Sequence, residues 1–183
     1  MTREPGHQVF AYTPGGGLVG LRIAATDRGD PIRNIRVYKE EHLPLIEAGA
    51  TFNPLWLTTL TGFDTLRFMD WITTNNSTIA TWDDLPTEAD FSYAWRGVPL
   101  SVMIALANEL DAHPWLNIPH LADDALVKRY AETVFETLEP DLVAHVEYSN
   151  EVWNFIFEQA RWAAAQAEER WGDVDGGWMQ FYG

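Results

Sequence analysis

The sequence has no cysteine, few basic residues and no long apolar run, and each lack excludes a class of protein. Without cysteine among its 183 residues, the chain has no disulfide, no thiolate nucleophile and no cysteine-based zinc site. Only 12 basic residues oppose 27 acidic ones, and the net charge of −15 repels nucleic acid. No apolar run reaches the roughly 20 residues that span a bilayer. We therefore expect neither nucleic acid nor a membrane as a partner.

Aromatic residues are abundant, with 9 tryptophans, 9 phenylalanines and 6 tyrosines. The hydrophobic fraction of 46% and the charged fraction of 21% are typical of a globular protein, and the length is near that of one domain. Many aromatic side chains must belong to a core, but this many tryptophans also favour a stacking surface. The five histidines show no metal-binding spacing, so we expect no metal and no cofactor.

Residues 1–31 are predicted to form a β-hairpin, the tail of a preceding β element. Apolar residues at 9–12 lead into the glycines at 15–17, and residues 21–25 then alternate like a strand. The glycines also match GxGxxG, but the dinucleotide-binding motif requires a helix to follow, so a hairpin turn is the better interpretation. The opening MTREPGHQVF contains no apolar core of an export signal.

From residue 32 onward, predicted strands and helices alternate four times. The expected strands are 34–38, 65–69, 113–118 and 143–148, and the expected helices are 54–60, 99–110, 124–139 and 155–171. Such βα units require a parallel sheet, either half of an eight-unit barrel or a small open α/β sheet. Because a full barrel takes about 250 residues, we predict that residues 32–183 are the first half of a (β/α)8 barrel, truncated at the C-terminus.

One connection, residues 72–97, is far longer than the usual 2–6 residues. It carries Trp82, Phe91, Tyr93 and Trp95, which is too aromatic for a disordered segment. It follows the C-terminal end of a strand, where α/β enzymes build their sites. Two interpretations stay open: a surface that stacks on sugar rings, or a loop that folds around a small core of its own.

Polar residues that could perform chemistry follow the predicted strands. Arg67, Asn117, His120 and Glu151 fall at strand ends that converge on one edge of a parallel sheet. If the last strand stays regular to residue 151, alternation places Glu147, Ser149 and Glu151 on one face. Glu147 lies mid-strand and is expected to form a buried ion pair, with Arg67 as the candidate partner.

The run HVEYSNEVWN at 145–154 resembles the fourth strand of clan A glycoside hydrolases. Its Asn150-Glu151 pair is similar to the Asn-Glu pair of that clan, although Val152 stands where many members have proline. LRFMDW at 66–71 is similar to the arginine-bearing second strand, and WLNIPH at 115–120 to the third. The resemblance implies a TIM barrel.

For function, the resemblance implies retaining hydrolysis of β-glycosidic bonds in an exported polysaccharide-degrading enzyme. Glu151 would be the general acid/base, Asn150 would bind the sugar 2-hydroxyl, and Arg67 would hold the nucleophile ionised. The nucleophile, a glutamate on strand seven, would lie in the remaining half of the barrel. His120 completes the catalytic candidates, and the aromatic candidates for binding an oligosaccharide or polysaccharide are Trp71, Trp82, Trp95, Tyr148 and Trp153.

Plainer interpretations compete with these roles. His120 could be a satisfied strand-end residue, Asn150 a helix cap, and Glu151 a first-turn glutamate favoured by the helix dipole. The alternative function is a non-catalytic carbohydrate-binding protein on the barrel scaffold, because a fold does not fix a function. A complete small α/β domain of unrelated role is the third possibility.

Overall fold

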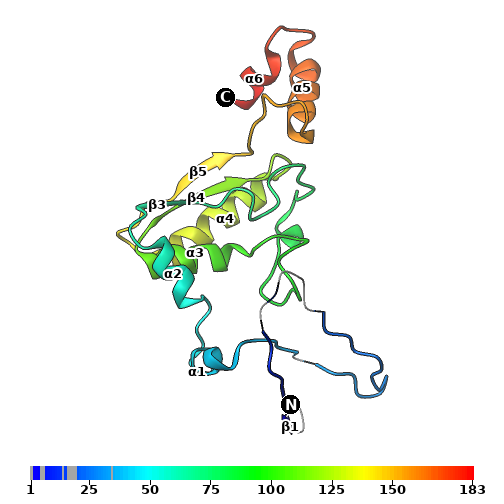
Figure 1. Ribbon diagram of the computed structural model, residues 1–183. Coiled ribbons are helices and arrows are strands. Elements are labelled where there is room, and N and C mark those ends of the chain that lie inside the picture. The colour runs from blue at the N-terminus through cyan, green and yellow to red at the C-terminus, as the bar shows by residue number, and fades with distance from the viewer. Residues whose placement is uncertain (1, 5–6, 14, 16–19, 34) are drawn as a thin grey trace. The chain divides into compact units, whose positions relative to one another are not determined.

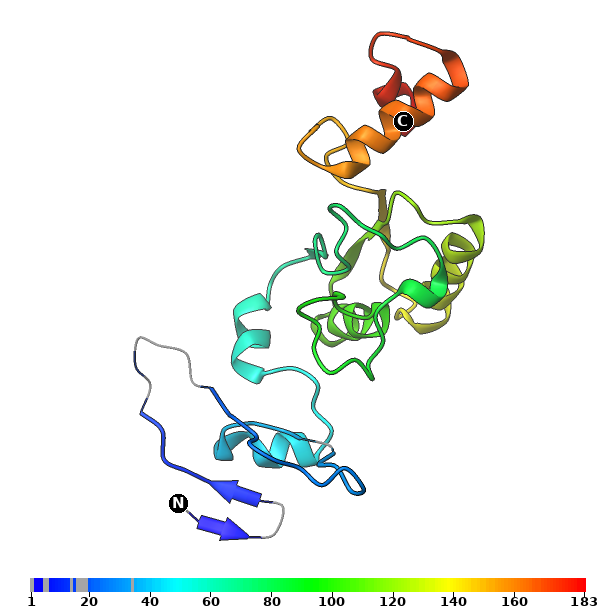
Figure 2. The same ribbon diagram turned by 90° about the vertical axis from the view of Figure 1, so that its right-hand side faces the viewer.

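The computed structural model describes residues 2–4, 7–13, 15, 20–33 and 35–183. The chain divides into two compact units, residues 1–53 and residues 54–183. The predicted boundary between residues 31 and 32 lies inside the first unit. Figures 1 and 2 show the course of the chain in two views.

The first unit contains a short antiparallel hairpin and two short helices. Strand β1 (Thr2–Glu4) pairs with β2 (His7–Val9), and η1 (Glu40–His42) leads into α1 (Leu43–Glu47). A hairpin is therefore present within residues 1–31, but it lies earlier than predicted. Residues 10–13 and 20–26 form no strand, and Gly16 and Gly17 of the predicted turn lie outside the described residues. Leu21 is 62% exposed. Among the described residues, the alternating apolar side chains at 21–25 therefore pack against nothing that would stabilise a strand.

The first of the four strands predicted for the barrel is not formed. Asn34 lies outside the described residues, and residues 35–38 have no regular structure. Ile35 and Val37 are 57% and 67% exposed. A strand is stabilised by pairing with a neighbouring strand and by burying the apolar side chains of one face. The apolar side chains of residues 35–38 are not buried. The expectation of four βα units is corrected to a sheet of three strands.

The second unit is an α/β structure built on a parallel sheet. Strands β3 (Thr65–Arg67), β4 (His113–Ile118) and β5 (His145–Tyr148) lie in the order β3-β4-β5, with β4 central. All pairings are parallel, as the βα alternation predicts. The sheet is open, and closure into a barrel stays a prediction. Helix α2 (Pro54–Leu60) precedes β3 and begins at the proline predicted to start it.

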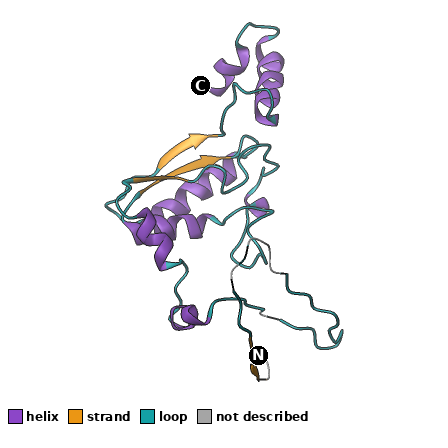
Figure 3. Cartoon of the chain, viewed as in Figure 1, coloured by secondary structure: helices purple, strands orange, loops and turns teal. Residues whose placement is uncertain are grey.

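Helices α3 (Leu100–Leu110) and α4 (Asp124–Thr137) lie on one side of the sheet (Figures 1 and 3). The start of α4 is capped by Asp123, whose carboxylate accepts a hydrogen bond from the Leu126 amide at 2.7 Å. Leu106, Leu116 and Leu126 are at most 1% exposed and form the centre of this packing. We call the side that holds Leu116, Ile118 and Val146 the helix-covered face.

The connection between β3 and α3 includes the short helix η2 (Trp82–Asp84), which a capping box between Thr81 and Asp84 begins. Further along, Arg96 donates hydrogen bonds to the carbonyls of Asp84 and Leu85 at 3.0 and 3.2 Å, so the segment folds back on itself. Gly97 has φ +94°, and a Cβ there would collide with the Trp71 carbonyl. The loop is therefore ordered by internal hydrogen bonds, whereas Phe91 and Trp95 are 91% and 65% exposed, and both interpretations of its sequence stay open.

Helices α5 (Glu158–Trp171) and α6 (Gly177–Tyr182) follow β5 and pack on each other. Aromatic edges form the contact: Phe181 of α6 meets Trp162 and Trp171 of α5 at ring-centroid distances of 5.4 and 6.2 Å. Part of the aromatic content thus serves packing. Among the described residues, no helix combines the length and the apolar character that a membrane crossing requires.

Candidate functional site

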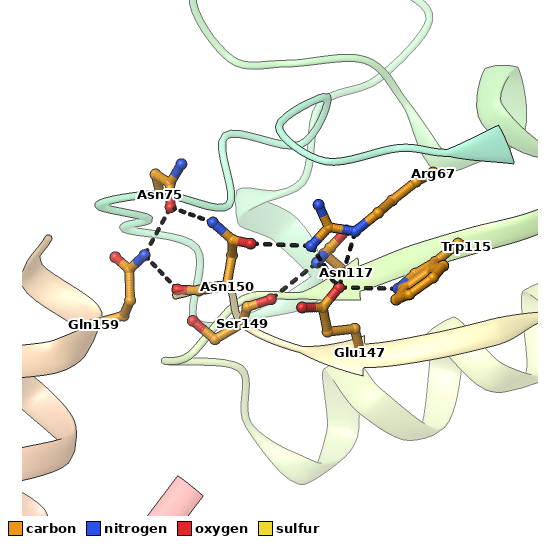
Figure 4. Close-up of polar contacts among 8 residues, drawn as sticks. All are labelled: Arg67, Asn75, Trp115, Asn117, Glu147, Ser149, Asn150 and Gln159. Carbon is orange, nitrogen blue, oxygen red and sulfur yellow. Dashed lines mark hydrogen bonds and ion pairs between the residues drawn. The ribbon is translucent and has the colours of Figure 1, made fainter. Parts of the chain in front are cut away.

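Side chains from all three strands meet at the carboxylate of Glu147 in β5 (Figure 4). Its Oε2 accepts hydrogen bonds from Arg67 Nη2 at 2.7 Å and Arg67 Nε at 3.2 Å. The same oxygen accepts hydrogen bonds from Trp115 Nε1 at 2.9 Å and Asn117 Nδ2 at 3.0 Å. The predicted ion pair between Glu147 and Arg67 is present, but it is partly exposed rather than buried. Two neutral donors add hydrogen bonds to this carboxylate.

The strand register explains why these residues meet. Arg67 is opposite Trp115, and Asn117 is opposite Glu147 in the parallel ladders. Since side chains alternate between the faces of a sheet, all four project from the same side. We call this side the polar face, and it is opposite the helix-covered face. The Arg67 and Glu147 side chains are 39% and 22% exposed, so the ion pair is reachable from solvent.

The backbone after β5 turns sharply, which corrects one expectation. The strand ends at Tyr148, and Ser149 and Glu151 have positive φ angles of 59° and 44°. Strict alternation therefore stops before residue 149, and Glu147, Ser149 and Glu151 do not continue along one face. Positive φ in residues other than glycine is strained and gathers at functional sites. The turn brings the side chain of Asn150 back toward Arg67.

Asn150 is held at both ends of its amide. Its Oδ1 accepts a hydrogen bond from Arg67 Nη2 at 3.0 Å, and its Nδ2 donates to Asn75 Oδ1 at 3.1 Å. The residue is 4% exposed. Because α5 begins at Glu158, Asn150 is not its cap and Glu151 is not in its first turn. Those two plainer interpretations are thereby excluded.

A cavity of about 390 Å³ opens beside this network. Its lining comes from β3, from β5 and the turn after it, and from α6: Arg67, Glu147, Asn150, Glu151, Val152, Trp153, Met179 and Tyr182. Three of the four predicted catalytic residues, Arg67, Asn150 and Glu151, are thus brought together. Glu151 is half-buried, and its Oε2 accepts a hydrogen bond from Asn154 Nδ2 at 3.0 Å.

The fourth predicted catalytic residue, His120, is not part of the cavity lining. It is 3% exposed, and its ring meets Trp162 of α5 edge-on at 5.3 Å. Burial lowers the pKa of His120 below its ordinary value, against the opposing effect of Glu158. No described residue forms a hydrogen bond with its buried Nδ1. The structure thus places His120 in the packing between the strand end and α5.

The predicted aromatic binding residues separate into two groups. Trp153 lines the cavity and is 62% exposed, and Tyr148 stacks at 6.1 Å on Tyr182, which is a lining residue. Burial raises the pKa of the Tyr148 and Tyr182 hydroxyls, so both keep their protons as donors. The tyrosine pair and Trp153 offer apolar ring faces next to the charged groups.

The other three aromatic candidates lie outside the cavity lining. Trp71 stacks on Trp56 at 6.1 Å, and Trp82 has the Arg129 guanidinium over its ring at 4.4 Å. Each contact covers one of the two faces of the indole ring. Trp95 is 65% exposed and stacks on Phe91 at 6.4 Å, so its position is that of a separate surface.

Several residues that complete the site carry no functional signal in the sequence. Met179 and Tyr182 reach the cavity only because α6 folds back, and no local pattern announces that. Asn75 belongs to Asn75-Asn76-Ser77, which matches a glycosylation sequon, but in the structure its side chain binds Asn150. No grouping of three or more histidine and acidic side chains suited to a metal ion occurs in the part of the chain that the structure describes.

Comparison with known proteins gives no relative: no family model, no curated protein and no solved structure matches the chain. The chemistry of the site therefore carries the functional argument. A carboxylate fixed by arginine, a second carboxyl group and aromatic rings around one cavity fit a neutral, hydroxyl-rich ligand with an apolar ring face.

Proposed function

We propose that this chain forms part of a glycoside hydrolase-like site in which Glu151 is the general acid/base. One observation carries the proposal: Arg67 at the end of β3 and Asn150 and Glu151 in the turn after β5 line a single cavity together with Trp153. The same residues support the resemblance to clan A glycoside hydrolases. The spacing of these residues in the sequence does not predict a cavity, whereas in the structure they surround a space that can hold a ligand.

In this mechanism, Glu151 donates its proton to the glycosidic oxygen while a carboxylate attacks the anomeric carbon and the carbon–oxygen bond breaks. Glu151 then removes a proton from water, whose oxygen displaces the enzyme carboxylate and restores it. Asn150 Nδ2 donates one hydrogen to Asn75 and keeps a second for a sugar hydroxyl. The proposal places the nucleophile on a seventh strand, beyond the strands described here.

The first test uses Glu151→Gln, which keeps the shape of the side chain and removes its acid function. The 183-residue chain is titrated with cellotetraose, mannotetraose and xylotetraose by calorimetry. In a longer chain that carries the nucleophile, turnover is measured on β-glucan, mannan and xylan. We expect the variant to bind its tetrasaccharide within about threefold of the parent chain and to lose about 10²–10⁴-fold in turnover.

Glu169→Gln is the matched control, because Glu169 is an exposed glutamate of α5. It should change neither affinity nor turnover. Near-normal hydrolysis by Glu151→Gln would refute the acid/base role. Multiple turnover by the unextended 183-residue chain would refute the downstream position of the nucleophile.

A non-catalytic carbohydrate-binding protein is the second candidate, favoured by the exposed pair Phe91 and Trp95. Their rings are 91% and 65% exposed and stack at an interplanar angle of 27°, outside the cavity. Such a platform holds a sugar ring without any chemistry. Tetrasaccharide binding that is lost in Trp95→Ala and unchanged in Glu151→Gln, with no hydrolysis by the longer chain, would favour this candidate.

A further inference from the structure

Gln159 is a fully buried amide next to the site, and its side chain forms hydrogen bonds with Asn75, Asn76 and the Asn150 carbonyl. It is 0% exposed and lies at the start of α5. Its Nε2 donates hydrogen bonds to Asn75 Oδ1 and to the Asn150 carbonyl, both at 2.8 Å. Its Oε1 accepts a hydrogen bond from the Asn76 amide at 3.0 Å. Both donor hydrogens are thus used, and the orientation of the amide is determined.

Asn75 connects Gln159 to the side chain of Asn150. Its Oδ1 accepts two hydrogen bonds, from Gln159 Nε2 at 2.8 Å and from Asn150 Nδ2 at 3.1 Å. Figure 4 shows the chain of contacts running from Gln159 through Asn75 and Asn150 to Arg67. The chain joins α5, the segment after β3 and the turn after β5, which are far apart in the sequence.

The position of these bonds matters because the turn that they hold is strained. Ser149 and Glu151, on either side of Asn150, both have positive φ. Such a backbone persists only where the surrounding structure determines it. The Gln159 bond to the Asn150 carbonyl acts on the residue between the two strained positions.

From this geometry we propose that Gln159, acting through Asn75, is a positioning residue that sets the orientation of Asn150 and the turn that presents Glu151 to the cavity. The inference rests on the proposed function for its sugar-binding consequence, while the orientation of Asn150 is measurable without a sugar. Gln159 touches no cavity space itself, since it is not among the lining residues. Its effect on a ligand is therefore indirect.

The experiment uses the 183-residue chain and four variants: Gln159→Met, Asn75→Leu, Asn75→Asp and Gln166→Met. Asn75→Asp retains the oxygen that accepts both hydrogen bonds, whereas Asn75→Leu removes it at similar volume. Gln166→Met is the matched control, because Gln166 is half-buried on the same helix and lies outside the network. The probes are the side-chain NH₂ signals of Asn150 in a ¹⁵N correlation spectrum and the affinity for the three tetrasaccharides.

We expect the Asn150 signals to shift and to exchange with water about tenfold faster in Gln159→Met and Asn75→Leu, because each variant removes one hydrogen bond that Asn150 itself makes. The dissociation constant for the tetrasaccharide bound best should rise about tenfold in the same two variants. Asn75→Asp and Gln166→Met should behave like the parent chain. Rescue by aspartate but not by leucine identifies hydrogen-bond acceptance rather than packing as the cause.

Unchanged Asn150 signals in Gln159→Met and Asn75→Leu would overturn the inference, and so would an Asn75→Asp variant that resembles Asn75→Leu. If Gln159→Met fails to fold, the two Asn75 variants decide the question at a half-buried position. A parent chain that binds none of the three tetrasaccharides would count against the proposed function alone, because the NMR result still decides the role of Gln159.

Discussion

The helix-covered face and the polar face of the sheet come from alternate residues of the same strands, yet they differ in almost every property. The helix-covered face holds Leu116 and Ile118, which are 0% and 5% exposed under α3 and α4. The polar face holds Arg67 and Glu147, linked by an ion pair that remains open to solvent. One face gains stability by burying apolar area, and the other keeps charges where a ligand can reach them.

The difference is not absolute, because the helix-covered face is incomplete at β5. Val146 is 64% exposed and borders an apolar groove of about 560 Å³, together with residues of α4 such as Tyr130 and Val134. The groove follows the edge strand of the open sheet. Covering is thus complete over the central strand β4 and partial over the edge strand β5.

The largest effect should come from breaking the helix-covered face at its centre. Leu116→Ala removes a side chain that is 0% exposed and leaves a cavity, so the free energy of unfolding should fall by about 2–5 kcal/mol. Val146→Ala is the matched control, because Val146 is the register partner of Leu116 but is exposed. We expect it to lower stability by less than about 1 kcal/mol. Urea denaturation measures both, and equal losses would contradict the contrast between the two strands.

A smaller effect is expected from the polar face. Glu147→Gln removes the negative charge that pairs with Arg67 and leaves a single oxygen to accept from Arg67, Trp115 and Asn117, so it should lower the free energy of unfolding by about 1–3 kcal/mol. Glu132→Gln is the control, because Glu132 pairs with Lys128 at 3.8 Å on the exposed side of α4. It should cost less than about 0.5 kcal/mol. A loss in Glu147→Gln no greater than in the control would show that the four hydrogen bonds contribute little.

The smallest effect concerns pH. Burial lowers the pKa of His120 below its ordinary value of 6.5, despite the nearby Glu158. Below about pH 6.5 the unfolded chain therefore binds a proton that the folded chain takes up only at lower pH, so stability is present above 6.5 and is lost as pH falls through the window beneath it.

Melting temperatures at about pH 7.5 and about pH 5.5 measure this pH dependence. We expect His120→Gln to melt at a smaller temperature difference between the two conditions than the parent chain. His145→Gln, at an exposed histidine of β5, serves as the control and should leave the difference unchanged. An unchanged difference in His120→Gln would show that His120 does not contribute to acid sensitivity.

The regular elements of the second unit could largely be predicted from sequence. Strand β4 has the predicted bounds, α3 begins one residue after Pro99, and α4 begins at Asp124, the first residue of the predicted helix. Apolar spacing and capping chemistry are local properties, and they agree here with the tertiary packing. The strand predicted at 34–38 shows the limit, because residues 35–38 have no regular structure. Alternating residues form a strand only where a neighbouring strand and a covering layer exist.

The candidate site was predictable in part. The strand ends and the parallel sheet predict that Arg67 and Glu147 approach each other, and they do. The positions of His120 and Tyr182 could not be predicted, because they depend on how α5 and α6 pack after β5. The acid/base role of Glu151 stays a prediction that the proposed experiments address.

By itself, the sequence determined the acidic charge, the lack of thiol chemistry, the βα alternation and which strand residues share a face, since these follow from composition and from the period of two. Only the tertiary structure decided that the chain turns at Ser149, that Gln159 of α5 holds Asn75 and Asn150, and that α6 closes one wall of the cavity. The physical reason is that a buried polar side chain must form hydrogen bonds with whichever groups the fold places beside it. These groups lie far apart in the sequence, so the spacing of residues along the chain does not predict them.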